Sequence, residues 1–386
     1  MSNLHRLTSI PLSFETLLKG QLRFMQQQYD VTAICSDKER LEKIGEDEGV
    51  KTYPVELTRQ ITLRKDFNAV IKLYRYFRKE KPFIVHTHTP KAGLIGMLAA
   101  YLARVPNRLH TVAGMPLMEA SGMKRKILNV TEKLTYRCAT HVYPNSKGLY
   151  EFIIKNHFCL ANKLKIIGAG SSNGIDTQHF SPAYFSSNER NKLKKRFNIQ
   201  LNSFIFCFVG RLVKDKGINE LVQSFMEVNE QYPQTKLLLV GPFERELDPL
   251  FPETEKAIQE NPNIISVGFQ TDVRPFLAIS DIFVFPSYRE GFPNVVMQAG
   301  AMDLPSIVTD INGCNEIIEE GVNGLIIPSK NKEQLKEKMM LLIEDKDLRN
   351  HLKQHAREMI TSRYEQKMVW DALLEEYRRL ETQNHT

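Results

Sequence analysis

Hydrophobic residues along the chain follow two alternating patterns. Short runs rich in β-branched and aromatic residues, typical of buried strands, alternate with longer segments in which apolar residues recur at helical spacing. The clearest helical segment spans residues 217–231, where Ile218, Leu221, Val222 and Phe225 share one face and glutamates occupy the other. The strand candidates are 31–35, 83–88, 108–112, 141–144, 164–167, 204–209, 236–240, 264–267, 282–286, 306–309 and 325–327.

This alternation predicts an α/β protein made of two domains. Near-continuous apolar strands between helices indicate parallel, doubly wound sheets covered on both faces. The series restarts near residue 203, after a polar stretch at 181–202, so we expect Rossmann-like domains at 1–180 and 181–363. A last helix within 364–386 could pack on either domain, including back on the first. Tandem doubly wound domains would place a ligand cleft between them, at the carboxyl ends of their strands.

Size and composition agree with two ordinary domains in a reducing compartment. A chain of 386 residues is too long for one typical core, and its five scattered cysteines contain no Cys-x-x-Cys pair that would indicate zinc or a disulfide framework. The most apolar stretch, 92–105, is too short to span a bilayer, and the first residues do not resemble a signal peptide. We expect a cytoplasmic protein, soluble or peripheral on the inner face of the cytoplasmic membrane.

Charge is distributed unequally between the halves. Residues 1–180 hold 27 Lys and Arg against 15 Asp and Glu, whereas the rest of the chain is slightly acidic, for an overall charge of +7. The first half is therefore expected to face an anionic partner, either nucleic acid or an acidic lipid surface, unless its basic residues are simply solvated.

The strongest local motif spans residues 209–217, Val-Gly-Arg-Leu-Val-Lys-Asp-Lys-Gly. It lies where a buried strand is followed by an amphipathic helix. Gly210 allows a tight turn, and Arg211 and Lys216 would lie beside the free amides at the start of the helix, which favours pyrophosphate binding. Taken alone, the motif fits a solvated loop better than a binding site.

A second motif follows about seventy residues later. After a strand ending near Pro286, the chain passes through Glu290-Gly291-Phe292-Pro293, and a helix is predicted to begin near Asn294. Gly291 permits close approach of the backbone to a ligand, and the helix amides would offer further phosphate donors. Glu290 is placed to accept hydrogen bonds from hydroxyls, although a Glu at this position also suits the helix dipole.

Together the two motifs resemble the signature of family-4 glycosyltransferases, which have the GT-B fold of two Rossmann-like domains. Two further segments agree with the family pattern: Asn173-Gly174-Ile175-Asp176, and the stretch from Thr309-Asp310 to Pro328. The resemblance extends over nearly the whole chain. It implies transfer of a sugar from a nucleotide diphosphate with retention at the anomeric carbon.

The resemblance also implies a set of site residues. Arg211 and Lys216 would bind the donor pyrophosphate, and Glu290 the hydroxyls of the donor sugar. Gln298 stands where the family has a Glu that holds the ribose. The remaining donor-binding positions would be Gly210, Gly291, Phe292, Pro293, Asn294 and Val295. The catalytic candidates are therefore Arg211, Lys216, Glu290 and His110. No metal and no other cofactor is expected, because the chain supplies the cations.

In the first half, strand ends carry histidines. His110 matches the family position near the donor sugar. For His86 and His88 a structural role at a strand end fits at least as well as a catalytic one, and His88 is also a candidate for acceptor binding. The region resembles enzymes of bacterial capsule, O-antigen and lipid-linked glycan assembly, including transferases that add N-acetylgalactosamine to an undecaprenyl-diphosphate sugar. This implies a UDP-sugar donor and a lipid-linked saccharide acceptor.

A basic helix is predicted at 122–137. Lys124, Arg125 and Lys126 alternate there with apolar residues, a composition typical both of a membrane-surface helix and of an ordinary half-buried one. A lipid acceptor favours the first interpretation, so the expected anionic partner is a membrane surface and not nucleic acid.

Two rival functions remain open. A nucleotide-sugar 2-epimerase of the same fold would share the donor site but need no lipid acceptor. A non-enzymatic two-domain sugar-binding protein is the other candidate, but such proteins are normally exported and have no need of a cationic diphosphate site.

Overall fold

The computed structural model describes residues 1–386 except 59–61, 116, 118–119, 247 and 384–386. The chain forms two compact units, each with its own parallel six-stranded sheet. Unit 1 comprises Met1–Asn173 and Lys367–Thr386, and unit 2 comprises Gly174–Gln366. The α/β class and the doubly wound architecture predicted from the sequence are confirmed.

Unit 1 is built on a sheet with the strand order β3-β2-β1-β4-β5-β6. Its strands are β1 (Asn3–Leu7), β2 (Asp30–Cys35), β3 (Lys51–Pro54), β4 (Ile84–Thr87), β5 (Asn107–Val112) and β6 (His141–Pro144). Its helices are α1 (Pro11–Leu17), α2 (Gln21–Gln26), α3 (Lys38–Glu48), α4 (Leu63–Glu80), α5 (Pro90–Leu102), α6 (Gly122–Cys138), α7 (Lys147–Lys155) and α16 (Gln366–Gln383).

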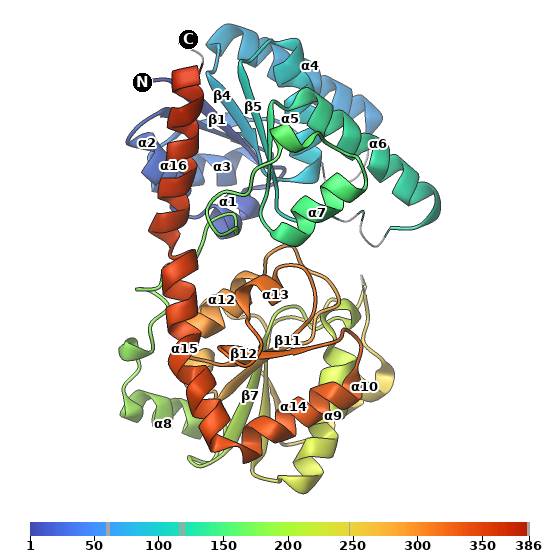
Figure 1. The fold of residues 1–386 in the computed structure, drawn as a ribbon, viewed down its shortest axis with the longest axis vertical. Helices are drawn as coiled ribbons and strands as arrows, with labels where there is room; N and C mark the ends of the chain where they lie inside the picture. Colours follow the sequence, from blue (N-terminus) through green and yellow to red (C-terminus); the bar gives the residue numbers. More distant parts are fainter. Residues whose placement is uncertain (59–61, 116, 118–119, 247, 384–386) are drawn as a thin grey trace. The chain divides into compact units, whose positions relative to one another are not determined.

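Helices cover both faces of this sheet (Figure 1). One buried cluster joins the sheet to α4, α5 and α7, and a second joins it to α1, α2, α3 and α16. The last helix, α16, thus completes the core of unit 1 through residues such as Leu373 and Tyr377, although it follows unit 2 in the sequence.

Unit 2 repeats the arrangement with the order β12-β11-β10-β7-β8-β9. Its strands are β7 (Phe204–Val209), β8 (Thr235–Val240), β9 (Ile264–Ser266), β10 (Ile282–Phe285), β11 (Ser306–Thr309) and β12 (Gly324–Ile327). Its helices are α8 (Ser187–Arg196), α9 (Ile218–Gln231), α10 (Pro252–Glu260), α11 (Arg274–Ala278), α12 (Asn294–Ala301), α13 (Cys314–Ile317), α14 (Lys332–Glu344) and α15 (Lys346–Tyr364).

Three expectations about the elements need correction. The predicted strand 164–167 is only an isolated bridge between Leu164 and Val142. Strands β1 and β3 were not predicted, although β1 is central in its sheet. The chain changes unit at 173/174 and 366/367, not at the predicted 180/181 and 363/364, because the segment after Asn173 bonds to the end of α15: Ile175 N donates to Tyr364 O at 2.8 Å.

Candidate functional site

The two motifs of unit 2 meet at the switch point of its sheet. From β7 the chain proceeds to β8 and β9 on one side, and β10 then pairs with the other side of β7. Because all strands are parallel, the loops that leave β7 and β10 emerge at the same edge, where doubly wound sheets bind ligands. These loops are residues 210–217 and 286–293, the segments that carry both motifs.

Close backbone packing joins the two loops. Gly217 adopts a φ of +70°, and a Cβ there would lie 2.2 Å from the carbonyl oxygen of Pro286, so only glycine fits. The backbone N–H of Tyr288 donates to Asp215 O at 2.8 Å, and the Arg289 guanidinium pairs with the Asp215 carboxylate at 2.9 Å. The relative position of the two motifs is therefore fixed within unit 2.

Lys216 and Glu290 form an ion pair across this junction. Their side chains are only 15% and 16% exposed. The hydroxyl of Ser287 lies 3.0 Å from Glu290 Oε1, and the Lys216 ammonium lies 5.6 Å from the centre of the Phe285 ring. The structure thus brings together two of the predicted catalytic residues, in a partly buried place where charge interactions are strong.

Arg211 is more open to solvent than Lys216. Its Nη1 lies 2.6 Å from Glu244 Oε2, and the two side chains are 43% and 30% exposed. Glu244 belongs to the loop that follows β8, a segment in which the sequence indicated no function. Both predicted phosphate-binding cations therefore have carboxylate partners.

The remaining donor-binding candidates line the start of α12. Phe292 and Pro293 are buried, and the Phe292 ring packs edge-on against Tyr364 at 5.3 Å, so only their backbones can face a ligand. The half-buried residues are Gly291, Asn294, Val295 and Gln298. Gly210 lies at the other loop, where its N–H donates to Val240 O at 2.9 Å.

In unit 1 the histidine His110 is buried within β5. Its Nδ1 lies 2.7 Å from Thr87 Oγ1, and its ring packs against Gly93 of α5, where a Cβ would come within 2.5 Å of the ring. Burial lowers the pKa of His110 to about 4, so the ring is neutral at neutral pH.

His86 and His88 lie side by side at the end of β4, with ring centres 4.2 Å apart. His86 Nδ1 is 2.6 Å from the Tyr377 hydroxyl, and its Nε2 is 2.8 Å from Thr111 Oγ1. Burial lowers the pKa of both histidines well below the usual value. These contacts connect β4 and β5 to α16.

A buried arginine that the sequence did not reveal completes this cluster. Arg6 in β1 is fully buried, and its Nε donates to His88 Nε2 at 3.0 Å. The same guanidinium donates to the Tyr377 hydroxyl at 3.2 Å and to the side-chain oxygen of Gln21. All three partners are neutral groups from distant parts of the sequence, so no local pattern could have indicated them.

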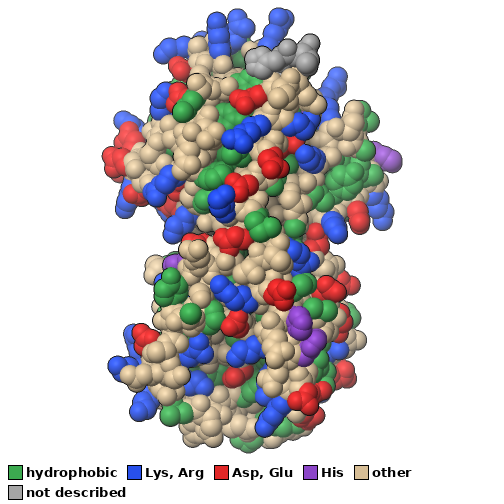
Figure 2. All heavy atoms as spheres, turned by 60° about the vertical axis from the view of Figure 1, so that its left-hand side comes forward, with side chains coloured by type: hydrophobic (Ala, Val, Ile, Leu, Met, Phe, Trp, Pro, Cys, Tyr) green, Lys and Arg blue, Asp and Glu red, His purple; other side chains and the backbone are tan. Residues whose placement is uncertain are grey.

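The predicted basic helix is α6, and its outer face is apolar as well as basic. Lys124 and Lys126 are exposed and Arg125 is half-buried. An exposed apolar stripe runs along the helix at positions 123, 127, 130 and 134, occupied by Met, Ile, Val and Leu, which are 38–70% exposed. Basic side chains also stand elsewhere on unit 1, and Figure 2 shows a group of them at the end near the C-terminus.

Two features are absent from the part of the chain that the structure describes. None of the helices there is both long and apolar enough to cross a membrane. In the same part of the chain, no three or more His, Cys, Asp or Glu side chains are grouped as metal ligands.

Comparison with known proteins agrees with this geometry. The family described as "Glycosyl transferases group 1" matches residues 189–359, and "Glycosyl transferase 4-like domain" matches 21–170. The capsular polysaccharide biosynthesis glycosyltransferase CapM of Staphylococcus aureus is 34% identical over 364 residues, which cover 92% of each chain. The Escherichia coli enzyme named UDP-Gal:alpha-D-GlcNAc-diphosphoundecaprenol alpha-1,3-galactosyltransferase is 30% identical over 83% of this chain and 82% of its own.

Among solved structures, Anabaena Alr3699/HepE in complex with UDP superposes with a TM-score of 0.81 at 20% identity, covering 98% of this chain and all of that one. The two sheets and the cationic switch-point site thus define a glycosyltransferase of the GT-B class. More specifically, the chain belongs to the group 1 glycosyltransferase family, whose relatives here include enzymes of capsule and lipid-linked glycan assembly.

Proposed function

We propose that this enzyme transfers a sugar, an N-acetylhexosamine or a hexose, from a UDP-sugar to a lipid-diphosphate-linked saccharide, with retention at the anomeric carbon. The observation that carries the proposal is the pairing of Lys216 with Glu290 at the switch point of unit 2, with Arg211 in the neighbouring loop. A cation for phosphate and a carboxylate for sugar hydroxyls are the two groups that a nucleotide-sugar site needs side by side.

Binding of the donor would break these ion pairs and replace them with contacts to the donor. Its diphosphate would accept hydrogen bonds from Lys216 and Arg211, and the released Glu290 carboxylate would accept from hydroxyls of the donor sugar. As the bond between the sugar and UDP breaks, negative charge grows on the leaving phosphate, where the two cations stabilise it. This role for protein cations supports catalysis that needs no metal ion.

Retention would follow if the acceptor hydroxyl attacks the anomeric carbon from the same face of the sugar from which UDP departs. The acceptor hydroxyl forms the new bond to the anomeric carbon while the bond to UDP breaks, and the departing phosphate takes the hydroxyl proton. The name of the Escherichia coli relative specifies UDP-Gal and an alpha-1,3 linkage, and UDP-galactose holds its sugar in the α configuration. His110 is neutral at neutral pH and would contribute to the sugar site as an uncharged group.

The acceptor would be held by unit 1 at a membrane. The Escherichia coli relative is named for an acceptor with N-acetylglucosamine on a lipid diphosphate, which supports the same acceptor class for this chain. Helix α6 suits an anionic membrane surface, because its exposed apolar stripe is flanked by Lys124, Arg125 and Lys126. The apolar side chains would enter the interface, and the basic ones would pair with lipid headgroups.

A donor-by-acceptor screen tests the proposal. The purified enzyme would be incubated with radiolabelled UDP-sugars, and with GDP-sugars for comparison, in the presence and absence of lipid-diphosphate saccharides. We expect label in the lipid fraction with one UDP-sugar. A changed or released sugar in the absence of any acceptor, with no label in lipid, would instead favour a nucleotide-sugar epimerase.

A further inference from the structure

In unit 2, the loop that follows β11 packs closely against the loop between β10 and α12, which carries Glu290. Gly313 has a φ of +78°, and a Cβ there would lie 2.5 Å from the carbonyl oxygen of Gly291, so a glycine is needed. At the end of β11, the Thr309 hydroxyl donates to the carbonyl oxygen of Ser287. The first loop therefore holds the backbone of the second from one side.

Asn312, in the first of these loops, binds two successive carbonyl groups of the second. Its Nδ2 donates to the carbonyl oxygen of Glu290 at 3.1 Å and also to the carbonyl oxygen of Gly291. Because backbone carbonyls can only accept, the nitrogen of the Asn312 amide, and not its oxygen, faces the loop. A single side chain thus fixes the orientation of two neighbouring peptide groups.

These two peptide groups present their N–H bonds on the side opposite to Asn312. Both peptides are trans, so the C=O and N–H bonds of each point in opposite directions. The N–H groups of Gly291 and Phe292 are therefore directed away from Asn312, and neither has an acceptor among the described residues. Asn294 and Val295, the first residues of α12, add N–H groups that have no acceptor within the helix. The loop thus offers several oriented hydrogen-bond donors.

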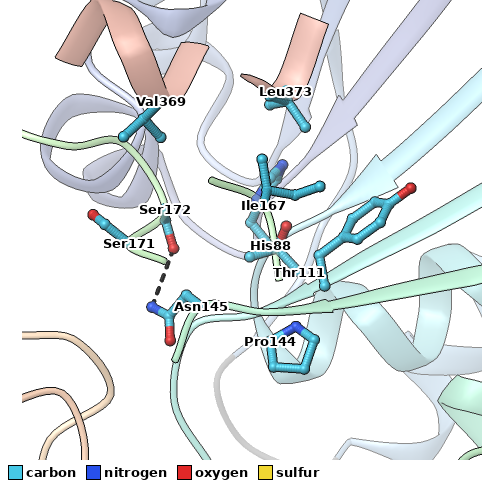
Figure 3. Close-up of a pocket in the computed structure, with 10 residues that line it drawn as sticks. His88, Thr111, Pro144, Asn145, Ile167, Ser171, Ser172, Val369 and Leu373 are labelled. Carbon is cyan, nitrogen blue, oxygen red and sulfur yellow. Dashed lines mark hydrogen bonds between the residues drawn. The ribbon is translucent and has the colours of Figure 1, made fainter. Parts of the chain in front are cut away.

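Unpartnered polar groups also occur in unit 1, but there they leave no room for a substrate. His88 Nδ1 and Asn145 Oδ1 are buried without partners in the described chain, and both residues line a small pocket (Figure 3). Its cavity volume is about 20 Å³, enough for about one water molecule. The N–H groups of Gly291 and Phe292 differ, because they lie at the sheet edge to which the proposed function assigns the donor.

We propose that Asn312 is a positioning residue for the donor, because it aims the N–H groups of Gly291 and Phe292 at two oxygen atoms of the UDP-sugar. The inference rests on the proposed function, which assigns the UDP-sugar to these loops. The two oxygen atoms belong to the diphosphate or to the donor sugar, both of which accept hydrogen bonds. Donors that are already oriented need no rearrangement as charge grows on the leaving group, which is the condition for strong electrostatic stabilisation.

Two substitutions separate orientation of the peptide groups from simple packing. Asn312→Ala removes both hydrogen bonds and leaves the carbonyls free to turn. Asn312→Leu also removes both hydrogen bonds but keeps a side chain of similar size without adding charge. If Asn312 acts by orienting the peptides, both variants should be impaired equally, whereas a packing role would spare the Leu variant. Asn315→Ala is the matched control, because Asn315 on α13 only donates to Asp310 Oδ1, at 2.8 Å on the exposed surface.

The measurement is the affinity for uridine, UDP and UDP-galactose, by titration calorimetry or by NMR for weak ligands, with thermal melting to confirm that each variant is folded. We expect Asn312→Ala and Asn312→Leu to weaken binding by about tenfold while uridine binding stays unchanged. A loss already seen with UDP assigns the two oxygen atoms to phosphate, and a loss seen only with UDP-galactose assigns them to the sugar. An equal loss with uridine, wild-type affinity in Asn312→Leu, or the same loss in Asn315→Ala overturns the inference. Wild-type protein that binds UDP no more tightly than uridine would refute the proposed donor site itself.

Discussion

Lys216→Met is the substitution that most directly tests the donor site, because the structure predicts separate effects on stability and on catalysis. Methionine keeps the length of the side chain but removes its charge. The Glu290 carboxylate would then remain 16% exposed, with the Ser287 hydroxyl at 3.0 Å as its only nearby donor among the described contacts. An almost buried carboxylate without its cation destabilises the folded state.

The size of the loss follows from the degree of burial. Breaking a fully buried ion pair costs about 3–5 kcal/mol, and the residual exposure and Ser287 lower this to about 2–3 kcal/mol. For a unit of this size the loss corresponds to about 4–12 °C in Tm. Loss of the cation should also slow turnover at saturating donor by roughly 10²–10³, as when one electrostatic donor to a leaving group is removed.

The double variant Lys216→Met/Glu290→Gln separates the two effects. With both charges removed, no buried carboxylate remains, so calorimetry should show most of the lost stability recovered. Turnover should stay low, because the diphosphate still lacks Lys216. Wild-type turnover in the single variant at saturating UDP-sugar would refute the diphosphate role. Recovery of turnover together with stability in the double variant would assign Lys216 a purely structural role.

Four other variants or conditions test the remaining expectations. Glu244→Gln should strengthen UDP binding by up to about fivefold in calorimetric titration, because an exposed pair with Arg211 is worth at most about 1 kcal/mol; unchanged affinity would mean that the carboxylate does not compete with phosphate. Activity should persist in EDTA, and a loss restored by Mg²⁺ or Mn²⁺ would contradict the metal-free proposal. Changing the basic triplet 124–126 to Glu should weaken sedimentation with anionic vesicles, most clearly at low salt, while UDP binding is retained; unaltered sedimentation would place the membrane surface elsewhere. Unit 1 should lose stability as the pH falls from about 6.5 to 4. In this range His110 binds a proton in the unfolded chain but stays neutral in the folded one, where its pKa is about 4. Urea unfolding followed by the fluorescence of the single tryptophan, Trp370 in α16, would measure this loss. A urea midpoint that is the same at pH 7 and pH 5 would contradict the prediction.

Most of the fold could be predicted because buried parallel strands are continuously apolar. Strand β7, with the sequence Phe-Ile-Phe-Cys-Phe-Val, is recognisable without any partner. Strand β1 was missed because His5 and Arg6 interrupt its apolar pattern, yet both side chains are buried. The edge strand β3 has only partly buried or exposed residues and gives no such signal.

The candidate site was predictable only as far as its residues are neighbours in sequence. Gly210 to Gly217 and Glu290 to Gln298 form compact motifs, so the sequence alone makes them candidates. The carboxylate opposite Arg211 comes from a different loop, and Tyr377 reaches Arg6 across nearly the whole chain. Such partners depend on tertiary packing, which composition and spacing do not encode locally.

Solvent exposure distinguishes the cations that are placed to meet a ligand from the one that supports the fold. Arg211 is 43% exposed and Lys216 is 15% exposed, and each is paired with a carboxylate that a diphosphate would replace in the proposed donor site. Arg6 also lies near a switch point, that of unit 1, but it is fully buried and all its partners are neutral. No ligand can reach its guanidinium without unpacking the sheet from α16. Its guanidinium therefore supports the sheet edge from within, and its bond to His88 Nε2 leaves the proton of the neutral His88 ring on Nδ1.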